Sequence, residues 1–132
     1  MNTKLLMTAS AFIMGALGII ASFMPVEILQ ALEQTPTPTL ILVVQITGSL
    51  YFGFALINWM AKSYLMGGIY AKPLAIGNFA HFLIAGIAIV KAAVSNSITP
   101  KYIFILAIIY LLFAIAFGIV AFTNPKVITN SK

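Results

Sequence analysis

Apolar residues fill four long and almost uninterrupted runs of this chain, at residues 5–24, 40–60, 74–94 and 102–122. A helix needs about 20 mostly apolar residues to cross a lipid bilayer, so each run predicts one membrane-spanning helix. The first run follows Lys4, as the apolar part of a signal peptide would. Because that run is long for a signal peptide and no convincing small-residue cleavage site follows it, we expect a retained span.

Short segments connect the runs, and short connections favour antiparallel helices that are neighbours in space. We therefore expect an all-α, up-down four-helix bundle that forms a single membrane domain over residues 1–132. Between the first two spans, residues 26–34 mix apolar and polar side chains in a pattern that predicts a short helix at the water interface. The following segment holds Pro36 and Pro38 between threonines, which predicts a stiff extended spacer.

The composition supports a membrane location. Apolar residues make up 62% of the chain, charged residues make up 7%, and the mean hydropathy is +1.11. Soluble domains carry about a quarter charged residues. The chain has no Cys, one His and two acidic residues, so thiolate metal sites and disulfides are excluded and little remains to bind a metal or catalyse hydrolysis. We expect no enzymatic activity, no metal and no cofactor.

The net charge of +5 comes entirely from lysines scattered along the chain, whereas a nucleic-acid surface would cluster its cations and include Arg. With the N-terminus inside, the cytoplasmic lysines are Lys4, Lys62, Lys72, Lys126 and Lys132. Lys91 and Lys101 then lie outside, together with Glu27 and Glu33. The positive-inside rule favours this N-in/C-in orientation. We expect Lys91 to reach from the end of its span to the outer head groups, with an ion pair to either Glu as the alternative.

Small residues recur at helical spacing in three spans and predict packing seams, since small side chains let helices approach closely in lipid. These stripes comprise Ala11, Gly15, Gly18 and Ser22 in the first span, Asn78, His81, Ala85, Ala88 and Ala92 in the third, and Ala107, Tyr110, Ala114, Gly118 and Ala121 in the fourth. The second span has an apolar face for lipid or a partner helix, formed by Leu42, Val43, Ile46, Leu50, Phe54 and Ile57. Its other face should turn inward, because desolvated polar groups need partners; it comprises Gln45, Gly48, Ser49, Tyr51 and Asn58.

Polar residues at similar depths predict one cluster between the second and third spans. Its members are Tyr51, Asn58, Asn78 and His81, with Gln45 nearer the outer side. An ionisable group inside a span is by default a functional hypothesis, so His81 is the main candidate for binding a ligand or a proton. A structural role, in which its imidazole forms a hydrogen bond between helices, fits better, and metal binding fits least because the chain offers no second strong ligand.

Three segments resemble a pattern that recurs in small, uncharacterised four-span bacterial membrane proteins. They are Gln45-Ile46-Thr47-Gly48-Ser49-Leu50-Tyr51, Asn58-Trp59 and Ala75-Ile76-Gly77-Asn78-Phe79-Ala80-His81. In size and span count the chain is also similar to the DoxX-like group, some of which associate with quinone-linked oxidoreductases, although no DoxX motif matches. The resemblance implies a bacterial protein of the inner, cytoplasmic membrane.

Three functions fit these observations. The favoured one is a multi-pass membrane protein that binds a hydrophobic small molecule, a lipid or a membrane-protein partner within the bundle. The second is a small transporter or channel, which would be a homo-oligomer because four spans barely enclose a path. The third is an accessory subunit of a redox complex, in which His81 and Tyr51 would hold a quinone carbonyl and a partner would supply electrons.

Overall fold

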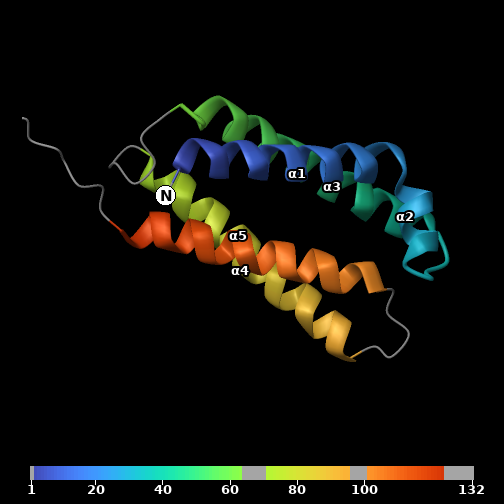
Figure 1. The fold of residues 1–132 in the computed structure, drawn as a ribbon. Helices are drawn as coiled ribbons and strands as arrows, with labels where there is room; N and C mark the ends of the chain where they lie inside the picture. The colour runs from blue at the N-terminus through green and yellow to red at the C-terminus, as the bar shows by residue number, and fades with distance from the viewer. Residues whose placement is uncertain (1, 64–70, 96–100, 124–132) are drawn as a thin grey trace, which may run out of the picture. The chain divides into compact units, whose positions relative to one another are not determined.

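The computed structural model describes residues 2–63, 71–95 and 101–123, and every regular element in this part of the chain is a helix (Figure 1). The helices are α1 (Thr3–Phe23), α2 (Pro25–Ala31), α3 (Pro38–Ala61), α4 (Lys72–Ser95) and α5 (Lys101–Phe122). All except α2 are long and apolar enough to cross a membrane. The four predicted spans are confirmed, with each end displaced by at most two residues. Two lysines used in the orientation argument, Lys126 and Lys132, lie outside the described residues.

Side chains at the helix starts fix where the elements begin. The Asn2 side chain accepts a hydrogen bond of 3.1 Å from the Leu5 amide at the start of α1. The Thr37 hydroxyl does the same for the Leu40 amide at 3.3 Å, directly before Pro38 opens α3. Such caps satisfy amides that have no partner within the helix. Proline is tolerated in the first turn because the amide proton that it lacks would have no acceptor within the helix.

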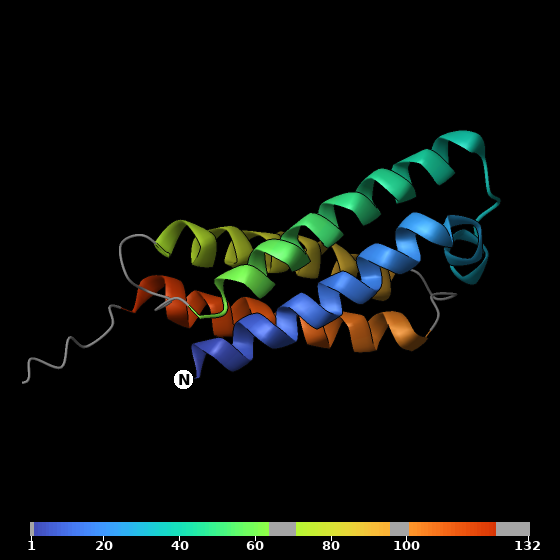
Figure 2. The ribbon, with the colours of Figure 1, turned by 90° about the horizontal axis from the view of Figure 1, so that it is seen from above.

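The short helix predicted at residues 26–34 is present as α2, which ends three residues earlier than predicted and turns away from the axis of α1 (Figure 2). Pro25 starts it, and Glu33, with a left-handed φ of 58°, follows its end. The chain reversal is closed by the Gln34 amide, which donates to the Leu29 carbonyl over 2.8 Å. The interfacial position of α2 stays a prediction.

The structure consists of two compact units, Met1–Ser63 and Tyr64–Lys132. In the first unit α1 packs along α3, and α2 contacts both. Two glycines allow this packing. A Cβ on Gly18 would lie 2.7 Å from the Phe52 nitrogen, and a Cβ on Gly48 would lie 2.7 Å from the Ser22 nitrogen. The two backbones therefore touch, which confirms the small-residue seam predicted for the first span.

The predicted apolar face of α3 is exposed, as a lipid-facing surface requires, except that Phe54 is half-buried. The opposite face is only partly inward. Asn58 and Gly48 are buried, whereas Ser49 and Gln45 are exposed, so within the first unit these two side chains do not face the packed interior. Backbone carbonyls satisfy these two side chains: Ser49 donates to Ile46 of its own helix over 2.7 Å, and Gln45 donates to Ser22 over 3.4 Å.

In the second unit α4 packs along α5. The stripe predicted for α5 is buried at Ala107, Tyr110, Ala114 and Ala121, and half-buried at Gly118. The stripe predicted for α4 is wrong in its second half, because Ala88 and Ala92 are exposed. Phe82 and Gly86 occupy the packing face instead. The Phe82 ring stacks on Phe113 and Phe117, with centroids 4.8 and 5.7 Å apart.

Candidate functional site

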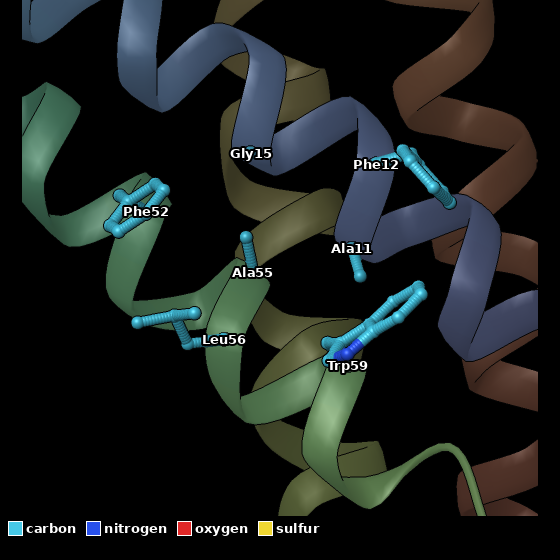
Figure 3. A pocket seen from close by; sticks show the side chains of 7 residues that line it. All are labelled: Ala11, Phe12, Gly15, Phe52, Ala55, Leu56 and Trp59. Atoms are coloured by element: carbon cyan, nitrogen blue, oxygen red, sulfur yellow. The ribbon is translucent and has the colours of Figure 1, made fainter.

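An open groove lies between α1 and α3 of the first unit and has a volume of about 290 Å³ (Figure 3). Its lining residues are Ala11, Phe12, Gly15, Phe52, Ala55, Leu56 and Trp59. Because Ala11, Gly15 and Ala55 have little or no side chain, they leave space between the helices. The larger side chains form the walls of that space. The indole N–H is the sole polar side-chain group among the lining residues. The groove therefore suits an apolar molecule.

The end of the groove at Trp59 is aromatic and carries a positive charge. The rings of Phe12 and Trp59 meet edge to face, with centroids 5.6 Å apart and planes at 86°. The Lys62 ammonium lies 2.9 Å from the centroid of the Trp59 ring. This cation–π contact holds the indole in place and positions a cation beside the groove.

A buried polar pair joins the same two helices next to the groove. The Asn58 amide nitrogen donates to the Ser10 hydroxyl over 3.1 Å, and both residues are 0% exposed. Ser10 in turn donates to the Met7 carbonyl over 2.9 Å. Each member directly precedes a lining residue, Ala11 or Trp59. The bond therefore ties together the two helix turns that form one end of the groove.

The second unit holds His81 and Asn78, both on α4. The His81 ring is half-buried, and its centroid lies 5.9 Å from that of Tyr110 on α5. Asn78 is fully buried and donates to the Leu74 carbonyl over 3.0 Å. This places an imidazole beside a buried phenol. Within the described ranges, no three His, Cys, Asp or Glu side chains come together as a metal site would require.

The predicted polar cluster divides between the two units. Tyr51, half-buried, and Asn58 belong to the first unit, while Asn78 and His81 belong to the second. Because the four residues belong to two different units, a cluster of all four stays a prediction. Gln45 contacts the end of α1 through the Ser22 carbonyl.

Ser10 and Tyr110 are polar residues that the sequence argument did not identify as site candidates. A polar side chain inside an apolar run was the available signal, since Asn58 was identified on the same grounds. Tyr110 was instead interpreted as part of a packing stripe, and Ser10 lies one position outside the stripe of its own span. The lining rings of the groove gave no signal, because Phe12 and Phe52 are two of ten phenylalanines in an apolar chain.

A second groove lies between α4 and α5 of the second unit. It has a volume of about 400 Å³ and is lined by Ile87, Val90, Lys91, Val94 and Leu111. It differs from the groove of the first unit in having a charged residue within its lining.

Four long apolar helices indicate that the chain is a multi-pass membrane protein. No family model, no curated protein and no solved structure matches it, so the functional argument rests on the chain's own residues.

Proposed function

We propose that this chain is a non-enzymatic membrane protein that binds a hydrophobic small molecule or a lipid in the groove between α1 and α3. The observation that carries the proposal is the combination of a small-residue floor with the rings of Phe12, Phe52 and Trp59. Aromatic rings supply large contact areas with few rotatable bonds, and a floor without bulky side chains lets a ligand approach the backbone.

Close packing of the two helices makes the groove preorganised. Gly18 and Gly48 bring the backbones into contact on one side of it, and the Asn58–Ser10 bond joins them on the other. In lipid the hydrophobic effect does not favour a bound apolar ligand over the surrounding chains, so affinity must come from packing. A groove whose two helices are already packed against each other gains that packing without the cost of bringing the helices together.

The single tryptophan allows a direct test, because Trp59 is the sole Trp of the chain and lines the groove. The purified full-length protein in detergent is titrated with a neutral dibrominated long-chain alcohol, whose bromine atoms quench an indole at contact distance. We expect quenching of the Trp59 emission to saturate. Phe12→Ala removes one wall and should weaken binding, whereas Phe23→Ala, on the same helix but outside the groove, should not.

A second pair of variants separates binding in the groove from contact with detergent-dissolved alcohol. Gly15→Leu fills the floor and should abolish saturable quenching. Gly53→Leu is the matched control, because a Cβ at Gly53 meets no atom within 4 Å. Circular dichroism checks that all variants keep their helical content. Quenching that rises linearly and equally in every variant would contradict the proposal.

We also propose that the four spans form one antiparallel bundle in a bacterial inner membrane, with both termini in the cytoplasm. The register within the first unit supports the antiparallel pairing, since Gly15 approaches Ala55 whereas Ser22 approaches Gly48. The lysine distribution supports the orientation.

A quinone-binding accessory role is the alternative favoured by the proximity of His81 to Tyr110, two hydrogen-bonding side chains on facing helices. It predicts that quinone is extracted together with the wild-type protein and is lost in His81→Ala. A transport role predicts instead a defined homo-oligomer, and solute flux that His81→Ala abolishes. Saturable Trp59 quenching that is unaffected by His81→Ala, without flux or quinone, favours the groove.

A further inference from the structure

The groove between α4 and α5 has an apolar lining that includes one charged side chain, Lys91. Ile87, Lys91 and Val94 are four and three residues apart, so they lie on one face of α4, and Leu111 of α5 closes the opposite side. Ile87 and Val94 are 56% and 77% exposed, respectively. In a membrane-spanning helix, exposed apolar side chains such as these contact the acyl chains of the lipids. The lining therefore suits one extended hydrocarbon chain with a charged group at Lys91.

Lys91 lies near the end of its helix. It precedes the last residue of α4, Ser95, by four positions, which is about 6 Å at a rise of 1.5 Å per residue. A lysine side chain can cover this depth with its methylene groups and place its ammonium at the level of the lipid head groups. The groove and the head-group region are thus adjacent at the level of the Lys91 ammonium.

The charge of Lys91 has no acidic counterpart in its own unit. The chain has two acidic residues, Glu27 and Glu33, and both belong to the first unit. The second unit also carries Lys72 and Lys101 at the starts of its two helices. Because the second unit offers Lys91 no carboxylate side chain, the surrounding lipid is the nearest source of an anionic partner.

We propose that the α4/α5 groove is a binding site for one anionic phospholipid. One acyl chain lies along Ile87, Val90 and Val94, and the phosphate binds the Lys91 ammonium. Selective binding needs both the apolar lining and the lysine. A free anion would gain no contact with the apolar lining. In a zwitterionic lipid, the ammonium of the head group would offset the charge of the phosphate. This site is independent of the ligand proposed for the first unit.

Native mass spectrometry of the full-length protein tests the proposal. The protein is titrated in detergent with phosphatidylglycerol or with phosphatidylcholine of the same chain length. We expect one phosphatidylglycerol to bind more tightly than phosphatidylcholine. Lys91→Gln should lower this preference about five-fold, which is the factor expected for one lysine next to anionic lipid. Lys91→Arg should retain the preference.

Two further variants separate the groove from diffuse surface charge. Lys101→Gln removes a charge at the start of α5 but leaves the groove lining intact, and it should retain most of the preference. Val90→Phe fills the half-buried wall of the groove and should weaken the binding of both lipids. Equal affinities of the wild-type protein for the two lipids would overturn the proposal. An effect of Lys101→Gln as large as that of Lys91→Gln would do the same, because it would show a diffuse charge effect.

The remaining alternative is an ion pair between Lys91 and a glutamate of the first unit. In that case Glu27→Gln or Glu33→Gln would lower the thermal stability in detergent as much as Lys91→Gln does, and added phosphatidylglycerol would not raise it. The lipid site predicts the opposite pattern: phosphatidylglycerol stabilises the wild-type protein and both Glu variants, and it does not stabilise Lys91→Gln. Either result decides between the two interactions.

Discussion

Asn58 and Ser10 form a hydrogen bond between two helices at a position where neither side chain is exposed. In a membrane the net gain from such a bond is modest, about 0.6 kcal/mol on average, because the separated helices find other partners for the same groups. The bond also fixes the rotation of α1 against α3 next to the groove. The bond can therefore affect both the free energy of unfolding and the binding of a ligand in the groove, and each effect has its own measurement.

We predict that Asn58→Ala lowers the free energy of unfolding by about 1 kcal/mol and that the double-mutant cycle with Ser10→Ala gives a coupling of about 0.6 kcal/mol. Reversible denaturation in mixed micelles measures both values. Ser49→Ala is the control, because this hydroxyl donates within its own helix, and its effect should stay within about 0.5 kcal/mol. Zero coupling in variants with native helical content would show that the bond contributes nothing.

At the scale of helices, the contact between α1 and α3 depends on the absence of side chains at two glycines. A Cβ on Gly18 would lie 2.7 Å from the Phe52 nitrogen and 2.9 Å from the Gly48 oxygen. Both atoms belong to the backbone, so no rotation of a side chain can relieve the overlap. The helices must move apart, and the groove beside them must change its width.

We predict that Gly18→Ala lowers the free energy of unfolding by about 1–3 kcal/mol, the usual cost of overpacking. Gly53→Ala provides the control on α3, where a Cβ meets nothing within 4 Å. There the higher helix propensity of Ala should stabilise the protein by about 0.5–1 kcal/mol. The same denaturation measurement compares the two variants. Equal effects at Gly18 and Gly53 would contradict the close packing of α1 against α3.

The sequence pattern predicts the helices better than their faces. Length and hydropathy define the four spans, whereas the caps at Asn2 and Thr37 were found in the structure. The face of α4 could not be assigned in this way, because alanines recur on several of its sides. There Phe82 stacks on two rings of α5, and Gly86 faces Tyr110 and Leu111 of the same helix. The groove has the same difficulty, since its rings become a wall only where Phe12 meets Trp59 across two helices.

At the scale of the whole molecule, the proposed orientation in the membrane rests on charges that lie far apart in the sequence. Lys4, Lys62 and Lys72 flank the spans on the predicted inner side, whereas the segment between α1 and α3 carries both glutamates. Lysines near span ends resist transfer across the membrane, and acidic residues contribute little to this bias. Lys91 and Lys101 lie on the predicted outer side and oppose this arrangement, so the proposed orientation rests on an excess of lysines on the predicted inner side.

The chain has no cysteine, so single cysteines report the orientation without background. We predict that Thr35→Cys, between α2 and α3, reacts with a membrane-impermeant maleimide in intact bacterial cells. Ser63→Cys and Thr123→Cys should react only after the membrane is permeabilised. One span separates residue 35 from residue 63, and three separate it from residue 123, so both must lie on the side opposite to residue 35 in a four-span chain. The reverse labelling pattern would show the opposite orientation, with Lys91 at the inner surface. Equal labelling of all three positions would indicate that the chain inserts in both orientations.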